Sequence, residues 1–378
     1  MMLNLVLVYI KKIYIPILLF AVLLIIWHCK PEKPKLNIPS PPSAWEYNST
    51  PFNLSYPQHF PPISFPIDNP LTEQGIELGR KLFYDPILSG DGTQSCADCH
   101  KQANAFTDPA PFSTGIDGLL GNRNAMTIIN LAWAPHSLFW DGRATSLEHQ
   151  ALGPVVNPIE MHNTWKNAAN KLKLHPQYPK LFYEAFGTAN IDSNLVVKAI
   201  AQFERTLISG NSRFDRWIKQ EIIPTALELQ GFNLFITDRN VNAGISGADC
   251  FHCHPHSNGM FTDFLLHNNG LDNEPFADKG LGELTGNPSD VGKFRTPTLR
   301  NWAFSAPYMH DSRFQTIDEV IDFYSSGLKH SSTIDPLMKN INDNGVQLSP
   351  QEKQALKAFL MMLNDTSFVT NPSFSKPD

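Results

Sequence analysis

Three features are scarce in this sequence: clusters of basic residues, alternating apolar and polar runs, and cysteine. Past the N-terminus no basic run occurs and the net charge is −6, which excludes a basic surface for binding nucleic acid. The scarcity of alternating runs argues against a protein built from sheet. The 378 residues, 42% of them hydrophobic, suffice for roughly two domains, since a domain takes about 100–200 residues.

The N-terminus has the order of an export signal. Lys11 and Lys12 precede an apolar run from Ile13 to Trp27, which is short for a spanning helix. Cys29 follows, where a bacterial lipoprotein carries its lipidated cysteine, but bulky residues precede it instead of the usual small ones. Residues 1–29 are thus a predicted signal, lipoprotein or membrane-anchor segment. We expect the rest of the chain in the periplasm or on an outer surface, with a possible membrane tether.

Proline is concentrated in one segment. The chain has 30 prolines, and they are densest between Pro31 and Pro70. Such a segment favours extended, polyproline-like backbone over a packed core. Residues 30–70 are therefore predicted to be a tether.

The few cysteines carry the strongest signal. The four beyond Cys29 form Cys96-Ala-Asp-Cys99-His100 and Cys250-Phe-His-Cys253-His254, two CxxCH motifs typical of covalent c-type haem attachment. On one helical turn, two thiols reach the two vinyl groups, and the adjacent histidine becomes the proximal iron ligand. A zinc site would not need histidine twice in the same place, and a redox disulfide would need a βαβ pattern that is not visible. The sequence predicts two covalent haems c, with His100 and His254 as iron ligands.

The two motifs lie in an internal repeat. Gly79 and Leu82 before the first motif match Gly231 and Leu234 before the second, and Phe-Thr-Asp follows each motif at 106–108 and 261–263. Further matches include Trp140-Asp141-Gly142-Arg143 with His310-Asp311-Ser312-Arg313. The spacing of apolar residues in 195–207 and 317–323 is helical. We predict an all-α chain with long loops and two haem domains related by duplication: an N-terminal one at 71–215 and a C-terminal one at 216–370.

These motifs carry a family resemblance. From about residue 70 to 365 the order LGRKLFYD, CxxCH, AFTD, FWDGR, GxxxNPxEM, CxxCH, RTPTLRN and APYMHDSRF resembles the bacterial diheme cytochrome c peroxidases, in particular their MauG-like branch. The resemblance implies two cytochrome-c-like domains with a calcium ion at their interface. It further implies one haem that binds peroxide and a second that relays electrons.

The repeat distinguishes the two haems. Aligning Arg143 with Arg313 places Pro154 opposite Tyr324, each in the segment expected to cross the distal side of its haem. Proline cannot ligate iron, whereas tyrosinate can. We therefore predict an open first haem and a second haem closed by Tyr324, as in the MauG-like branch. Met309 is the rival sixth ligand, although a methionine beside aromatics is more often packing.

The resemblance implies further site residues. Classical members close the resting peroxidatic haem with a histidine, but the loop at 112–118 has none, so the first haem is expected to be permanently five-coordinate. Gln150 and Glu160 match the distal pair, with Glu160 as general acid/base. Trp140 matches the tryptophan between the haems.

Calcium would take oxygen ligands from the Asn124 side chain and from the carbonyls of Ser305 and Pro307. Ser305 stands where the family often has threonine, a mild departure because only the carbonyl is used.

Three functions remain distinct. The first is reduction of hydrogen peroxide to water at the N-terminal haem, with electrons from a small cytochrome c or cupredoxin relayed through the C-terminal haem. The second is MauG-type oxidation of tryptophan residues in a partner protein. The third is a non-catalytic diheme electron carrier or sensor, which would gain nothing from an open iron beside Gln150 and Glu160. Between the first two the sequence is nearly silent, although Tyr324 favours MauG-like electronics; we expect the first.

Overall fold

The computed structural model describes residues 45–47, 49–134 and 136–378. The predicted signal segment with Cys29, and residues 30–44 and 48 of the predicted tether, lie outside these residues. Within the described part, no helix combines the length and hydropathy needed to span a bilayer.

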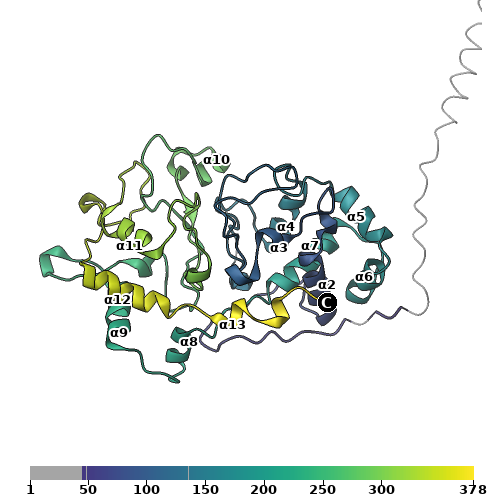
Figure 1. The fold of residues 1–378 in the computed structure, drawn as a ribbon, viewed down its shortest axis with the longest axis horizontal. Coiled ribbons are helices and arrows are strands. Elements are labelled where there is room, and N and C mark those ends of the chain that lie inside the picture. The colour runs from purple at the N-terminus through teal and green to yellow at the C-terminus, as the bar shows by residue number, and fades with distance from the viewer. Residues whose placement is uncertain (1–44, 48, 135) are drawn as a thin grey trace, which may run out of the picture. The chain divides into compact units, whose positions relative to one another are not determined.

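The described chain is mainly helical with long connecting loops, as predicted (Figure 1). A two-stranded antiparallel pair, β1 (Leu266–His267) with β2 (Phe294–Arg295), was not expected. The α-helices are α2 (Glu73–Tyr84), α3 (Cys96–Cys99), α4 (Leu147–Val156), α5 (Trp165–Leu174), α6 (Tyr178–Phe186), α7 (Ser193–Glu204), α8 (Arg213–Ile218), α9 (Ala226–Phe235), α10 (Leu281–Thr285), α11 (Ile317–Ser326), α12 (Pro350–Met361) and α13 (Thr366–Val369).

Two helix pairs form the core of the two halves. Helix α2 packs on α7, and α9 packs on α12. Each crossing is made at a glycine: a Cβ added at Gly79 would overlap the carbonyl oxygen of Ala199, and one added at Gly231 would overlap that of Ala355. Glycine allows the backbones to approach this closely because it has no Cβ. The two crossings therefore have the same local construction.

A second pair of helices also corresponds between the halves. Helices α4 and α11 each span 10 residues. Ser146 caps the first by accepting a hydrogen bond from the His149 amide, and Thr316 caps the second by accepting one from Glu319. Such caps satisfy amide groups that have no partner within the helix.

The described part of the predicted tether packs against the molecule. Its backbone is largely irregular, but Phe60 is buried beside Met260 and Phe264. The Trp133 indole donates a hydrogen bond to the carbonyl of Pro61 at 2.7 Å. Phe60 thus packs this proline-rich stretch into an apolar cluster. The proline content alone had predicted an extended tether.

The predicted boundary at residues 215 and 216 falls inside α8. Phe214 of this helix lies in the core of the second half, with Phe261 and Phe359. Asp215 is buried and forms an ion pair with Arg300 at 2.7 Å. Burial alone would raise the pKa of Asp215, but the guanidinium of Arg300 and its hydrogen bonds lower it well below its usual range.

Candidate functional site

Both CxxCH motifs present their histidine in the same way. Cys96 and Cys99 lie on the single turn of α3, and the Nδ1 atom of His100 lies 2.9 Å from the carbonyl oxygen of Phe106. Cys250 begins a 3-10 turn, and the Nδ1 atom of His254 lies 2.9 Å from the carbonyl oxygen of Phe261. Since a carbonyl can only accept, each ring carries its proton on Nδ1 and leaves Nε2 for a metal.

The electrostatics of the motifs suit iron ligation. Burial lowers the pKa of both His100 and His254, which keeps the imidazoles neutral. The four cysteines are free, and burial raises the pKa of Cys250 and Cys253 to about 12. Uncharged thiols and neutral imidazoles are compatible with an apolar macrocycle packed against them.

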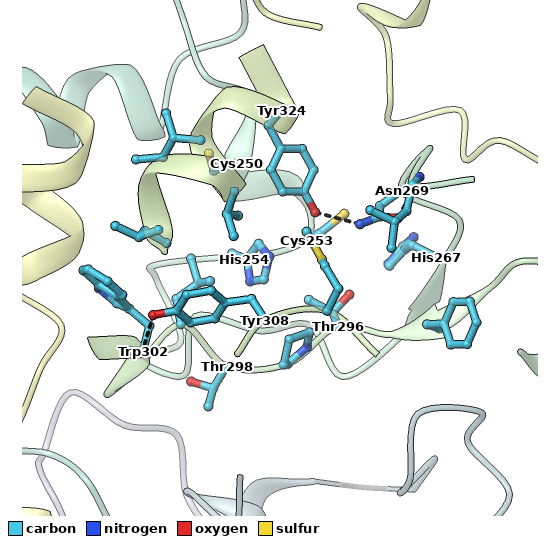
Figure 2. Close-up of a pocket in the computed structure, with 18 of the residues that line it drawn as sticks. Cys250, Cys253, His254, His267, Asn269, Thr296, Thr298, Trp302, Tyr308 and Tyr324 are labelled. Atoms are coloured by element: carbon cyan, nitrogen blue, oxygen red, sulfur yellow. Dashed lines mark hydrogen bonds between the residues drawn. The ribbon is translucent and has the colours of Figure 1, made fainter. Parts of the chain in front are cut away.

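The second motif opens onto a cavity of about 250 Å³. Cys250, Cys253 and His254 line it, and Tyr324 extends into it from α11 (Figure 2). The Tyr324 hydroxyl accepts a hydrogen bond from the Asn269 side chain at 2.9 Å. Burial, the largest influence, raises the pKa of Tyr324, and the Asn269 donor opposes it. Tyr324 therefore extends into the cavity from which a sixth ligand would have to reach the iron.

Met309, the rival ligand, lines the same cavity and packs beside Tyr324 in an apolar cluster with Leu271 and Phe323. The structure thus brings both candidates to the second site. The sequence did not identify Asn269, because an asparagine in an irregular loop has no pattern that links it to a tyrosine 55 residues away.

In the first half, helix α4 corresponds in length and capping to α11. In α11, Val320 and Tyr324 line the second cavity. Because α4 and α11 have equal length and equivalent caps, Gln150 and Pro154 occupy the corresponding positions. Pro154 lies inside α4 without breaking it, and it offers no atom that binds iron.

Glu160 lies beyond the end of α4 and is held by its neighbours. The Asn157 side chain donates a hydrogen bond to Glu160 at 2.6 Å, and the Glu160 carbonyl accepts one from the amide of Ile116 at 2.9 Å. Burial raises the pKa of Glu160, while Asn157 and the nearby Arg143 oppose this shift. The carboxylate also raises the pKa of the Cys96 thiol, after burial and other charges, so Glu160 is electrostatically coupled to the first motif.

The loop at 112–118 contacts this acid directly. Its backbone is bonded to Glu160 through Ile116, and a Cβ added at Gly115 would overlap the carbonyl of Ile159. This loop, which contains no histidine, therefore supports Glu160. Asn157, which orients the carboxylate, was missed by sequence reasoning, although it belongs to the NPxE motif.

Trp140 connects the two halves. Its indole donates a hydrogen bond to the carbonyl of Asn124 at 2.8 Å, and its own carbonyl accepts one from the amide of Arg295 at 2.8 Å. Its ring lies edge-on to His310 with 6.3 Å between centroids. Trp140 lines the same cavity as His254, so it borders the second site from the first half of the chain.

The three predicted calcium ligands lie along the same cavity. Asn124, Ser305 and Pro307 all line this cavity, and the Asn124 amide donates a hydrogen bond to the carbonyl of His310 at 2.8 Å. Arg295 is buried here as well, and its Nε has no hydrogen-bond partner among the described residues. Burial lowers the pKa of Arg295 to about 10. A buried guanidinium with an unused donor fits the propionate groups that a haem carries.

The chain matches a known family over much of its length. The family profile described as "Di-haem cytochrome c peroxidase" matches residues 73–222. The methylamine utilization protein MauG of Methylorubrum extorquens is 35% identical over 307 residues, covering 80% of this chain and 81% of the relative. The cytochrome c551 peroxidase of Nitrosomonas europaea is 36% identical over 253 residues, covering 65% and 71% of the two chains.

A solved structure has the same fold. The crystal structure of a MauG-like protein associated with microbial copper homeostasis superposes with a TM-score of 0.78 at 34% identity, covering 86% of this chain and 99% of the other. The diheme peroxidase BthA from Burkholderia thailandensis has a TM-score of 0.66 at 22% identity, which supports the fold.

Proposed function

Because this chain belongs to the di-haem cytochrome c peroxidase family, we propose that it reduces hydrogen peroxide to water at the haem of its first CxxCH motif. Two c-type haems would supply the iron that binds peroxide and a second redox centre. The observation that carries the proposal is the asymmetry of the two distal sides. We assign Gln150, Pro154 and Glu160 to the first side, whereas Tyr324 lines the cavity of the second.

Glu160 is proposed as the general acid/base. A carboxylate takes the proton from the inner peroxide oxygen and returns it to the outer oxygen, which leaves as water. With two electrons and two solvent protons, one peroxide gives two waters. The Asn157 hydrogen bond orients the Glu160 carboxylate, and Gln150 offers an amide to hold the peroxide.

Electrons are proposed to reach the first site through the second haem and Trp140. The indole borders the second cavity and belongs to the segment that leads into α4. The partner for this role is a small donor protein, a cytochrome c or cupredoxin. We also propose that the protein is exported to the periplasm, with or without a membrane or lipid anchor at Cys29.

Calcium is proposed at the interface of the halves, with ligands from the Asn124 side chain and the carbonyls of Ser305 and Pro307. The common cavity supports this arrangement, since calcium takes several oxygen ligands, backbone carbonyls included. The equivalent helix crossings and caps support the proposal that the halves are cytochrome-c-like domains that arose by duplication.

MauG-type oxidation of tryptophan residues in a partner protein is the second candidate function. Tyr324 favours it, because a tyrosinate ligand stabilises ferric and higher oxidation states of the second haem. The first site performs the same proton chemistry in both cases. The two functions differ only in the source of the electrons.

Steady-state turnover of peroxide with reduced cytochrome c tests the proposed function. The wild type is expected to turn over, and Glu160→Gln is expected to lose about 10²- to 10⁴-fold in rate while keeping both haems. Glu184→Gln on α6, which removes a carboxylate paired with Lys180, is the matched control and is expected to keep the wild-type rate. Wild-type turnover in Glu160→Gln would refute the role of this acid. An inactive wild type that oxidises a partner protein would favour the second candidate.

A further inference from the structure

A second buried acid lies near the first motif, and the proposed mechanism does not use it. Glu204 is the last residue of α7 and is 4% exposed, and its Oε2 has no hydrogen-bond partner among the residues the structure describes. The adjacent Arg205 forms an ion pair with Glu148 at 2.8 Å, and its charge opposes the effect of burial on the pKa of Glu204. Burial raises the pKa of Glu204 to about 8. An isolated buried carboxylate is costly, so its neutral form is favoured.

The repeat indicates where Glu204 points. The equivalent crossings, Gly79 on Ala199 and Gly231 on Ala355, set α7 in register with α12. In this register Glu204 corresponds to Leu360, which lines the second cavity together with Cys250 and His254.

The electrostatics of the first motif agree with this register. Its charge is the largest influence after burial on the pKa of the Cys96 thiol, which it raises. Glu204 therefore belongs to the wall of the first haem site, at a position where the second site has an aliphatic side chain.

We propose that Glu204 is a redox-linked proton site of the first haem. On one-electron reduction, by an external donor, of a haem held there, the Glu204 carboxylate would take up one solvent proton, and it would release the proton on reoxidation. The cause is Coulombic: an added electron removes one positive charge from a poorly solvated pocket, which disfavours a carboxylate beside it. Leu360 gives the second haem no equivalent group.

Few other charges face this acid. Arg205 lies next to it on α7, Glu148 approaches from α4, and Cys96 approaches from α3. Glu148 and Arg205 neutralise each other as an ion pair. Cys96 becomes a thioether once haem is attached and then does not titrate. Glu160 is the other buried carboxylate coupled to Cys96, and it stays in place when Glu204 is replaced. The part of the proton change that is lost on replacing Glu204 is therefore assigned to Glu204. The proposal rests on haem attachment at the first motif, but not on peroxide turnover.

The test is a spectroelectrochemical titration of both haems in the full-length holoprotein from about pH 5 to about pH 9. In the wild type, the potential of the first haem is expected to fall with rising pH, approaching about 59 mV per tenfold change in proton concentration. Glu204→Gln is expected to flatten this dependence. Glu204→Leu, which introduces the residue of the second half, is expected to do the same. The second haem should keep its wild-type dependence throughout.

Glu77→Gln, at an exposed position of α2, is the control and should titrate as the wild type does. An unchanged pH dependence of the first haem in both Glu204 variants would overturn the proposal. A protein that shows the expected potentials but no peroxide turnover would refute the proposed function and leave this inference standing.

Discussion

Glu160 combines two properties that a peroxide-cleaving acid/base needs. It is held in place by Asn157 and by the loop backbone at Ile116, and burial raises its pKa above that of an exposed glutamate. A raised pKa moves the group toward the pH at which it both accepts and returns a proton efficiently. Its position and its pKa thus arise from the same packing.

The pH dependence of peroxide reduction follows from this shift. Only the carboxylate form of Glu160 accepts the proton of peroxide, so the rate should fall as the pH falls through the raised pKa. The acidic limb should lie at higher pH than the ordinary range of an exposed glutamate, about 4.3. Measurement of kcat/KM against pH checks this. Glu160→Gln should lack that limb, and a limb that persists in the variant would assign it to another group.

The two candidate sixth ligands of the second haem, Tyr324 and Met309, can be distinguished by substitution. If Tyr324 is the sixth ligand, Tyr324→Phe removes the ligating oxygen and should change the spin state and absorption spectrum of that haem. Met309→Leu preserves the apolar packing and should leave the spectrum as it is in the wild type. The reverse pattern would identify Met309 as the ligand.

The helix pairs should depend on their glycines. A Cβ at Gly79 or at Gly231 would overlap the backbone of the facing helix, so Gly79→Ala and Gly231→Ala should each lower the free energy of unfolding by about 1–3 kcal/mol or more. Gly153→Ala in α4 is the control, since its added Cβ would meet the Phe139 ring at 3.6 Å, an ordinary contact. Chemical unfolding of the holoprotein measures the difference. Equal stability of all three variants would contradict the close-approach account.

Local patterns were sufficient to predict some elements and not others. The repeat placed α4 and α11 in correspondence, because equal spacing from the Arg143 and Arg313 motifs dictates equal helix positions. The position of α8 was not predictable, since Phe214 joins the second core through contacts with Phe261 and Phe359 that are distant in sequence. The ion pair of Asp215 with Arg300 is equally non-local.

The C-terminal segment also packs against regions far away in sequence. Phe368 of α13 packs against Phe106, and the Tyr84 hydroxyl donates a hydrogen bond to the carbonyl of Phe374 at 2.6 Å. The C-terminal segment thus returns to the first half, near α2, although residues up to 370 were predicted to belong to the second domain. Contacts of this kind depend on the assembled fold and leave no local pattern.

The site itself was largely accessible from the sequence because haem chemistry constrains it. CxxCH fixes two thiols and a histidine on one turn, and the structure gives both histidines the same Nδ1 contact with a backbone carbonyl. Supporting residues such as Asn157 and Asn269 follow no such constraint. Their roles depend on which loops are neighbours in the folded protein, and the sequence alone does not show this.

The claim that the first haem is open is tested most directly by adding hydrogen peroxide to the fully oxidised protein, with no reductant, and recording the Soret absorption in a stopped-flow instrument. Pro154 and the histidine-free loop at 112–118 predict an immediate change, because no ligand has to leave before peroxide binds. A Soret band that stays unchanged until the protein has first been reduced by one electron would contradict the account.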